Sequence, residues 1–181
     1  DEPGNVLRTH TTSVHLHYLG AQRDKGIPPP YRAVAMGKVF RNEATDITHE
    51  AEFFQVDGLA IGEDITLAHL RGTLTSFFSE LMKGTVEIRF RPSFFPFTEP
   101  SVEVDMRVTS PEAPEKLRGR WIEIMGAGML HPNVLRNYGI DPMKYRGFAF
   151  GGGLDRLAML RWGIDDVRLM HSADLRFVNQ F

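Results

Sequence analysis

The sequence predicts an α+β fold in which helices flank a mostly antiparallel sheet, within one domain over residues 1–181. Three observations support this expectation. Strand-like runs follow one another without the regular alternation of strand and helix that parallel sheets require. The segment Leu67–Met82 carries apolar residues at helical spacing. The length of 181 residues and the hydrophobic content of 42% suit a single globular core.

The first half of the chain predicts a helix, a hairpin and a second helix. The first helix is expected after one of three threonines that can act as its N-cap, Thr9, Thr11 and Thr12. Two histidines of this helix are expected to be exposed or capping, His15 and His17. Strands are predicted over Tyr31–Phe40 and residues 53–61, on either side of a polar loop. The helix over Leu67–Met82 is expected to end at Gly84.

The second half predicts further strands joined by turns. Alternating apolar and polar residues predict strands over residues 85–91, 101–106 and 120–125. Residues 92–100 hold three aromatic residues and three prolines, and we expect them to form a stiff apolar loop. A short buried strand is predicted over residues 147–150.

Helix starts are predicted at three places in the second half. Two Xaa-Pro pairs are typical of a first helical turn, His131-Pro132 and Asp141-Pro142. The glycine-rich turn at residues 151–153 is expected to open a helix that reaches Trp162. Short helical turns and a tail follow to the end of the chain.

Composition narrows the class of protein. The formal net charge of −2 provides no general basic field for nucleic acid, although local basic contacts remain open. The chain has no cysteine, so neither disulfides nor thiolate metal sites are expected. No apolar run approaches the length of a membrane span and the amino terminus is not a signal peptide, so we expect a cytoplasmic protein without a membrane partner. The first residue is Asp1, which indicates a piece of a longer chain.

The loop between the first two predicted strands carries more charge than a turn requires. Arg41, at the end of a strand, can hold a phosphate with its planar guanidinium group. Glu43 can accept hydrogen bonds from an exocyclic amine, and Phe53 offers a face for a stacked base. These residues suit a nucleotide better than a metal. An ordinary solvated hairpin with ion pairs would have the same composition.

The glycine-rich turn at residues 151–153 precedes Arg156 in the first turn of the predicted helix. Exposed amide groups and a guanidinium group at a helix start favour the end of a polyphosphate. The same pattern also fits tight packing beside a surface arginine. A second glycine pair, Gly126 and Gly128, allows the backbone to approach a neighbouring group closely.

Two further groups of residues suggest binding. Glu99 and Glu123 are carboxylates of the kind that hold magnesium near phosphates, or they are strand-end charges paired with Lys or Arg. Phe95 and Phe97, together with Ala149, could line an apolar pocket for a flat side chain, or belong to an ordinary core.

Taken together, these residues resemble a known family. Phe40-Arg41-Asn42-Glu43 with His49 and Phe53 is similar to motif 2 of class II aminoacyl-tRNA synthetases, about residues 38–61. The stretch GGGLDR at 151–156 is similar to motif 3, about residues 147–162. The stretch RFRPSFFPFTEPS at 89–101 closely resembles the signature of phenylalanyl-tRNA synthetase alpha subunits. Further similar stretches follow the same order along almost the whole chain, residues 7–11, 126–129, 131–136, 147–151 and 174–181.

The resemblance implies an ATP site with two catalytic arginines. Arg41 would bind the α-phosphate, and Arg156 would bind the γ-phosphate. Glu43 would read the adenine amino group, Phe53 would stack on adenine, and His49 would contact the phosphates. The amino-acid carboxylate attacks the α-phosphorus with little proton transfer, so no general base is expected.

The resemblance also implies an amino-acid site. The phenyl ring would be held by three residues, Phe95, Phe97 and Ala149. Four polar residues would hold the charged end, His10, Thr12, Gln55 and Asp57. Glu99 and Glu123 would contact either the substrate amino group or the Mg²⁺ that accompanies ATP. The implied activity is ATP-dependent activation of phenylalanine and its transfer to tRNA(Phe). A class II synthetase for another amino acid and a non-catalytic synthetase-like binding module are the alternatives.

The chain departs from the family pattern at three positions. Thr12 stands where Ser is usual, Asp57 where Glu is usual, and His15 where a glutamine is expected. By the resemblance, motif 1 and the amino-terminal coiled coil are expected to precede Leu7, and no anticodon-binding domain is expected after Phe181. As a partner, the resemblance implies a beta subunit in an alpha2beta2 heterotetramer.

Overall fold

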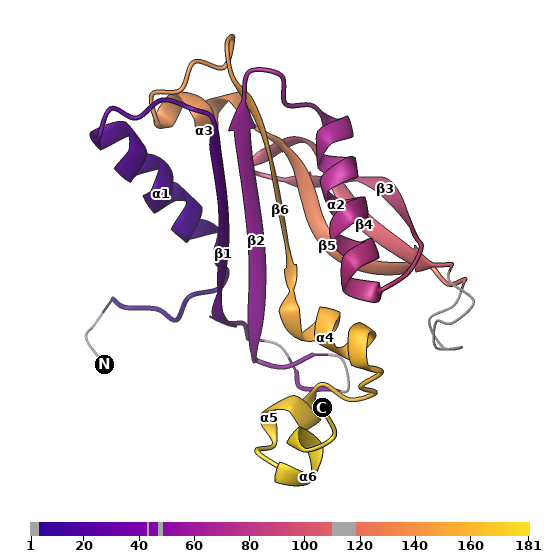
Figure 1. The fold of residues 1–181 in the computed structure, drawn as a ribbon. Helices are drawn as coiled ribbons and strands as arrows, with labels where there is room; N and C mark the ends of the chain where they lie inside the picture. The colour runs from indigo at the N-terminus through magenta and orange to yellow at the C-terminus, as the bar shows by residue number, and fades with distance from the viewer. Residues whose placement is uncertain (1–3, 43, 47–48, 110–118) are drawn as a thin grey trace.

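The centre of the structure is a six-stranded sheet in the order β1-β2-β6-β5-β4-β3 (Figure 1). All neighbouring strands are antiparallel, which confirms the α+β prediction. This computed structural model describes residues 4–42, 44–46, 49–109 and 119–181. The strands are β1 Tyr31–Phe40, β2 Glu52–Gly62, β3 Val86–Phe95, β4 Thr98–Val108, β5 Ile122–Leu130 and β6 Arg146–Gly153. The last strand, β6, lies between β2 and β5 and thereby joins the β1–β2 hairpin to the antiparallel strands β3, β4 and β5.

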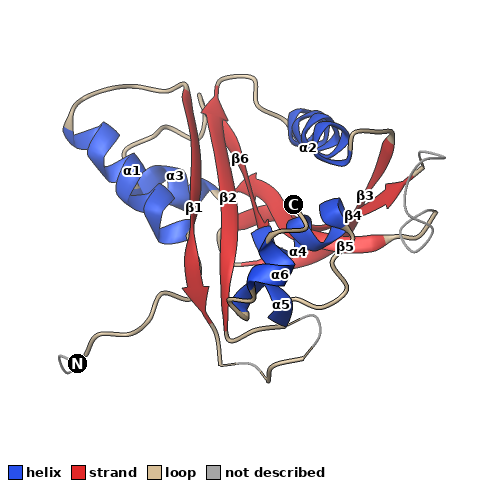
Figure 2. Ribbon diagram, turned by 60° about the horizontal axis from the view of Figure 1, so that its bottom comes forward, coloured by secondary structure: helices blue, strands red, loops and turns tan. Residues whose placement is uncertain are grey.

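Helices cover both faces of the sheet, as Figure 2 shows. They are α1 Thr12–Asp24, α2 Leu67–Met82, α3 Pro132–Asn137, α4 Leu154–Trp162, α5 Arg168–His171 and α6 Leu175–Val178. Leu59 and Ile61 of β2 pack in one cluster with Leu19 of α1 and Leu135 of α3. The intervening Ala60 belongs to a second cluster with α2 and α4. Because strand residues alternate between faces, α1 and α3 cover one face and α2 and α4 cover the other.

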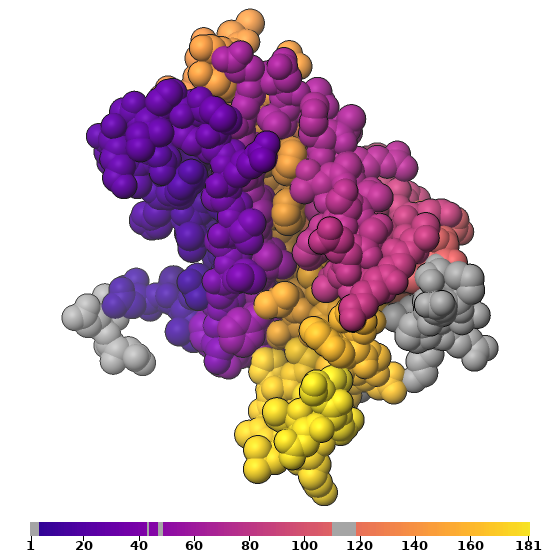
Figure 3. All heavy atoms as spheres, in the orientation of Figure 1, coloured from indigo at the N-terminus to yellow at the C-terminus, as the bar shows by residue number. Residues whose placement is uncertain are grey.

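The amphipathic helix α2 forms as the sequence predicts. Its inner residues, Leu70, Leu74 and Phe78, are each 0% exposed. Thr66 caps the amino terminus by accepting a hydrogen bond from the backbone N–H of His69. Burial of this one stripe fixes α2 on the sheet. The short carboxyl-terminal helices α5 and α6 lie at the end of the molecule opposite α3 (Figure 3).

Three boundary predictions are wrong. The glycines at residues 151–153 do not form a turn; they are the last residues of β6, paired with β2, and α4 begins directly after them. Strand β3 continues through Pro92 to Phe95, so residues 92–100 are not a loop, and only Pro96 and Phe97 separate β3 from β4. Pro92 is tolerated because β3 is the edge strand of the sheet, where an absent N–H donor costs little. The Asp141-Pro142 pair starts no helix. The Asp141 carbonyl accepts hydrogen bonds from the N–H groups of Lys144 and Tyr145, which close a single turn.

The other Xaa-Pro pair starts a helix as predicted. Pro132 is the first residue of α3, and the His131 side chain accepts a hydrogen bond from the Asn133 N–H. Thr11, one of the three predicted threonines, occupies the N-cap position of α1, but its side chain makes no capping hydrogen bond. Within the described ranges, no helix is long and apolar enough to cross a membrane.

Candidate functional site

A cavity of about 860 Å³ lies between α1 and the face of the sheet that α1 covers. Most of the predicted site residues line it: His10, Thr12, Arg41, Phe53, Gln55, Asp57, Phe95, Phe97, Glu123 and Ala149. These residues come from five strands or their ends and from the segment that leads into α1, so the fold brings together positions far apart in the sequence. His49, Glu99 and Arg156 do not line the cavity. Glu43 lies outside the described residues.

The middle of the cavity floor is bare backbone. Gly126 of β5 and Gly151 of β6 are register partners there. A Cβ atom added to Gly151 would lie 2.1 Å from Asp57 Oδ1, and one added to Gly126 would lie 2.8 Å from Phe95 Cζ. Both side chains therefore rest directly on glycine. For Gly126, this confirms the prediction that the pair Gly126 and Gly128 lets the backbone approach a neighbouring group closely.

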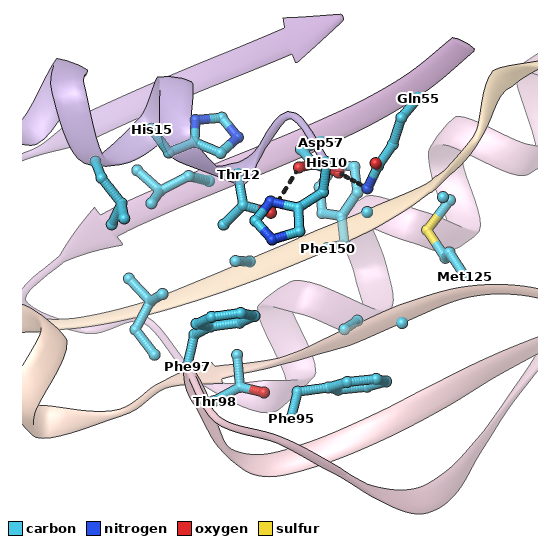
Figure 4. A pocket seen from close by; sticks show the side chains of 18 of the residues that line it. His10, Thr12, His15, Gln55, Asp57, Phe95, Phe97, Thr98, Met125 and Phe150 are labelled. Atoms are coloured by element: carbon cyan, nitrogen blue, oxygen red, sulfur yellow. Dashed lines mark hydrogen bonds between the residues drawn. The ribbon is translucent and has the colours of Figure 1, made fainter. Parts of the chain in front are cut away.

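Asp57 is the centre of the polar end of the cavity (Figure 4). Its side chain is buried, with 3% of the residue exposed. Thr12 Oγ1 donates a hydrogen bond of 2.9 Å to one carboxylate oxygen, and Gln55 Nε2 donates one of 2.8 Å to the other. A buried carboxylate oriented by two hydrogen bonds favours a cationic ligand group such as an ammonium.

Several buried polar atoms around Asp57 have no hydrogen-bond partner among the described residues: His10 Nδ1, both ring nitrogens of His15, and Gln55 Oε1. Unpaired buried polar atoms are costly, so native proteins rarely keep several of them together. Their concentration beside one carboxylate indicates a site where a polar ligand completes the hydrogen bonds. His10 and Gln55 were predicted from the family resemblance.

His15 was expected to be exposed or capping, and this prediction is wrong. The residue is 3% exposed and faces the cavity. It lies on the inner face of α1 because residues 12, 15, 16 and 19 recur at helical spacing toward the sheet. Burial lowers the pKa of the His15 ring, and both the negative charge of Asp57 and a polar contact with the Asp57 backbone oppose this shift.

The apolar end lies across the cavity from Asp57. Figure 4 shows Phe95 and Phe97 on this opposite side. The Phe97 ring is 41% exposed and meets the His10 ring edge-on, with 6.2 Å between ring centroids. Ala149 of β6 is the register partner of Leu59 and Gly128 on its two neighbouring strands. Two aromatic rings above small residues leave room for a flat apolar side chain.

One face of β2 connects the polar end to a second, outer end of the cavity. Phe53, Gln55 and Asp57 are two residues apart, so their side chains point to the same face of the strand. At the outer end, the Arg41 guanidinium lies 5.0 Å from the centre of the Phe53 ring. Arg41 Nε also donates to the Thr9 carbonyl at 3.5 Å. An aromatic face and an arginine therefore stand about four residues of strand beyond the buried carboxylate.

Arg156 lies in the first turn of α4, just behind this outer end. Its guanidinium donates a hydrogen bond of 3.0 Å to the backbone carbonyl of Glu123, a residue that lines the cavity. Sequence reasoning missed the residue beside it. Asp155 is 7% exposed and accepts a hydrogen bond of 3.1 Å from the Phe54 N–H of β2. This contact fixes the start of α4 against the strand that carries Phe53.

The structure does not bring Glu99 and Glu123 together. Glu123 is the register partner of Asp105, whereas Thr98, next to Glu99, pairs with Leu130 at the other end of β5. Glu99 is an exposed side chain that lies 3.4 Å from His131 Nε2. Within the described ranges, no three side chains of His, Asp or Glu are arranged to hold a metal ion. The magnesium assignment stays a prediction for each carboxylate separately.

Another carboxylate, Glu103, lines the cavity and was missed. Arg91 NH1 lies 2.9 Å from its Oε2 atom, and Arg91 NH2 lies 2.7 Å from Glu123 Oε2. The sequence contained a pattern that could have identified Glu103, because residues 101, 103 and 105 form the polar face of an alternating strand. His49, by contrast, lies in the hairpin loop, where its ring nitrogen is 3.1 Å from Asp46.

The whole chain, residues 1–181, matches the family described as "tRNA synthetases class II core domain (F)". It is 48% identical over 178 residues to the "Phenylalanine--tRNA ligase alpha subunit" of Stenotrophomonas maltophilia, covering 98% of this chain and 51% of that protein. The protein of the same name from Clostridium perfringens is 49% identical over 179 residues, covering 97% and 51%. That of Photobacterium profundum is 47% identical over 179 residues, covering 99% and 50%. The chain thus spans about half the length of the curated relatives it matches.

Proposed function

The chain belongs to the family of class II tRNA synthetase core domains, and from this premise we propose that it activates phenylalanine with ATP for transfer to tRNA(Phe). It would be the catalytic core of a phenylalanine–tRNA ligase alpha subunit, the name that its relatives bear. One observation carries the proposal. A single face of β2 holds a candidate base-stacking ring, Phe53, in line with the buried carboxylate of Asp57, opposite an aromatic pocket.

We assign the amino end of phenylalanine to Asp57. Its carboxylate is buried and is oriented by hydrogen bonds from Thr12 and Gln55, so an ammonium group would find a fixed negative charge. His10 adds a buried ring nitrogen at the same end. Asp57 is one methylene shorter than the glutamate usual in the family. Thr12 meets it at 2.9 Å, so the shorter side chain is held from the α1 side.

We assign the phenyl ring to the space beside the rings of Phe95 and Phe97, near Ala149. The absence of side chains at Gly126 and Gly151 lets Phe95 and Asp57 lie close against the sheet, which keeps the cavity above them open. Ala149 would limit the depth of this pocket. Burying an aromatic side chain here contributes on the order of 2 kcal/mol to binding.

We assign ATP to the outer end of the cavity. Phe53 would stack on adenine and Arg41 would bind the α-phosphate, while Glu43 and His49 in the hairpin loop would contact adenine and the phosphates. Arg156, at the start of α4, would bind the far end of the triphosphate. The amino-acid carboxylate then attacks the α-phosphorus and pyrophosphate leaves. Charge cancellation by Arg41 and positioning of the two substrates supply the acceleration, without a general base.

Mg²⁺ would enter this site with ATP, where it neutralises phosphate charge when bound. The carboxylates that line the cavity supply the oxygen ligands that magnesium prefers. We therefore assign the ion to Glu123, with Glu103 beside it, rather than to Glu99, which lies outside the cavity lining. Arg91 now pairs with both carboxylates.

We further propose a beta subunit as partner, because the relatives are named alpha subunits. An alpha2beta2 heterotetramer in the cytoplasm, acting on tRNA(Phe), is the assembly that this name suggests.

The test is amino-acid-dependent exchange of pyrophosphate into ATP, measured on the full-length protein with its beta subunit. We expect exchange with phenylalanine and not with the other standard amino acids. Exchange with a different amino acid would replace the assigned specificity with that of another class II synthetase. Ligand binding without exchange for any amino acid would identify a non-catalytic module.

A further inference from the structure

His15 has an unusual position in the cavity wall. It is 3% exposed, yet neither ring nitrogen has a hydrogen-bond partner among the residues that the structure describes. In Figure 4 the ring projects from α1 over the end of the cavity that holds Asp57 and Thr12. A buried imidazole normally fixes its tautomer by a hydrogen bond. The Asp57 backbone is near enough to raise the pKa of the ring but makes no well-formed hydrogen bond with it, so a ligand bound beside Asp57 can fix the tautomer.

The charged and titratable groups around His15 define what its protonation would do. Asp57 of β2 is the carboxylate at this end of the cavity. Glu103 of β4 lies in the same row of the sheet as Asp57 but three strands away. At the usual strand spacing, the backbones of Asp57 and Glu103 are about 14 Å apart. His10 precedes α1, Arg23 lies two turns further along α1, and Tyr138 follows α3. Asp57, Glu103 and Glu123 are the carboxylates that line the cavity, and Asp57 is the one whose charge acts on the pKa of the ring.

We propose that His15 is a proton-sensitive determinant of amino-acid binding, whose neutral ring accepts the ligand and whose protonated ring competes with the ligand's ammonium group for Asp57. This inference rests on the proposed function, since it takes an amino acid to be the ligand. It assigns His15 a role in affinity for the amino acid and none in the ATP end of the site.

The physical reason is charge. With the ammonium bound and His15 protonated, two cations would share one carboxylate in a poorly solvated pocket, and their repulsion is strong there. Proton binding and ligand binding therefore oppose each other, and by linkage each weakens the other equally. The bound ligand lowers the pKa of His15 further. Phenylalanine then binds with full affinity above the pKa of His15 in the free protein, and this affinity is lost as the pH falls through that pKa.

Because burial already lowers the pKa of His15 from 6.5, the loss falls on the acidic side of that value. Below the pKa of the free protein, the dissociation constant for phenylalanine should rise by up to about tenfold per pH unit. The ammonium group of phenylalanine and its carboxylate do not titrate in this range, so the change reports the protein.

The experiment is calorimetric binding of phenylalanine to the full-length protein with its beta subunit, without ATP, from pH 5 to pH 8. Two buffers of different ionisation enthalpy count the protons released. We expect release of part of a proton on binding below pH 6.5 and none at pH 8. Binding without proton release across the whole range overturns the inference, and this measurement needs no substitution.

The variant His15→Gln keeps a polar side chain that cannot take up a proton. We expect its dissociation constant to vary at least threefold less between pH 5 and pH 7 than that of the unchanged protein. The matched control is His17→Gln, on the exposed side of the same helix, which should keep the original pH profile. If His15→Gln keeps the pH profile of the unchanged protein, the inference is overturned but the proposed function is not. No phenylalanine binding at pH 8 by the unchanged protein overturns the proposed function and the inference with it.

Discussion

Gly126 and Gly151 face each other as register partners of β5 and β6, at the centre of the cavity floor. The aromatic ring of Phe95 rests on one and the carboxylate of Asp57 rests on the other. The apolar and polar ends of the site therefore meet over two adjacent residues without a side chain. Any Cβ atom at this point would displace one of the two groups that we assign to the amino acid.

Replacing Gly151 by alanine should impair amino-acid binding specifically. The added Cβ atom would lie 2.1 Å from Asp57 Oδ1, so the carboxylate must leave its place between Thr12 and Gln55. We expect the KM for phenylalanine in the exchange reaction to rise by at least about tenfold, equivalent to about 1.4 kcal/mol. The KM for ATP should change much less.

The control for this change is Gly72→Ala on the outer side of α2, where no atom lies within 4 Å of the added Cβ. It should leave both KM values unchanged and stabilise the helix by up to about 1 kcal/mol. An unchanged phenylalanine KM in Gly151→Ala would contradict the placement of Asp57 at the amino end.

Replacing Arg41 by alanine should abolish exchange while leaving the fold intact. The guanidinium group stands over the Phe53 ring at the outer end of the cavity, where we place the α-phosphate. Loss of a group that stabilises charge in the transition state typically lowers kcat by about 10²–10³-fold. Circular dichroism should detect no loss of structure, because Arg41 is an exposed residue beyond the end of β1.

The matched control is Arg32→Ala, which removes an exposed arginine within β1. This variant should keep normal exchange. Near-normal activity of Arg41→Ala would refute the role that we assign to that residue.

Much of the fold could be predicted because its signals are local. The apolar stripe of α2 and the alternation along the strands are visible in short windows of sequence. The stretch 92–100 was misjudged because prolines usually interrupt strands, and the sequence does not show that β3 is an edge strand. Only the strand order makes Pro92 acceptable within a strand.

The site depends on tertiary arrangement, which residue types alone do not specify. Glu99 and Glu123 formed a plausible magnesium pair in the sequence, but the β4–β5 register separates them. The same register brings Glu103 to the cavity instead. His15 could not be placed either, because helical spacing alone does not say which side of α1 meets the sheet.

Replacing Phe97 by alanine should weaken the use of phenylalanine more than the use of ATP. The ring faces the cavity from the short turn between β3 and β4 and meets His10 edge-on. Removing a partly buried aromatic ring should raise the KM for phenylalanine by about tenfold, with the KM for ATP nearly unchanged. The control is Phe94→Ala, whose residue is 83% exposed and should tolerate the change. An equal rise in both KM values would count against the pocket.

Replacing Asp105 by asparagine should destabilise the sheet in a pH-dependent way. Asp105 is 1% exposed and accepts hydrogen bonds from Arg91 at 2.8 and 2.9 Å and from Arg89 at 3.0 and 2.5 Å. The hydrogen bonds from Arg91, with those from Arg89, hold the pKa of Asp105 below 3.8, although burial acts in the opposite direction. Removing the charge leaves two guanidinium groups without their shared partner, which should cost about 3 kcal/mol at pH 7.

The sign of the pH effect follows from the lowered pKa. The carboxylate stabilises the fold fully above its unfolded value near 3.8, and this contribution is lost as the pH falls through the folded value. Thermal unfolding should therefore show a large difference between Asp105→Asn and the unchanged protein at pH 7, and a smaller one below pH 3.8. Glu87→Gln serves as the control, because the Glu87 side chain is 48% exposed in its ion pair with Arg107 and should contribute less than the buried Asp105. A difference that stayed constant with pH would show that Asp105 acts through its shape rather than its charge.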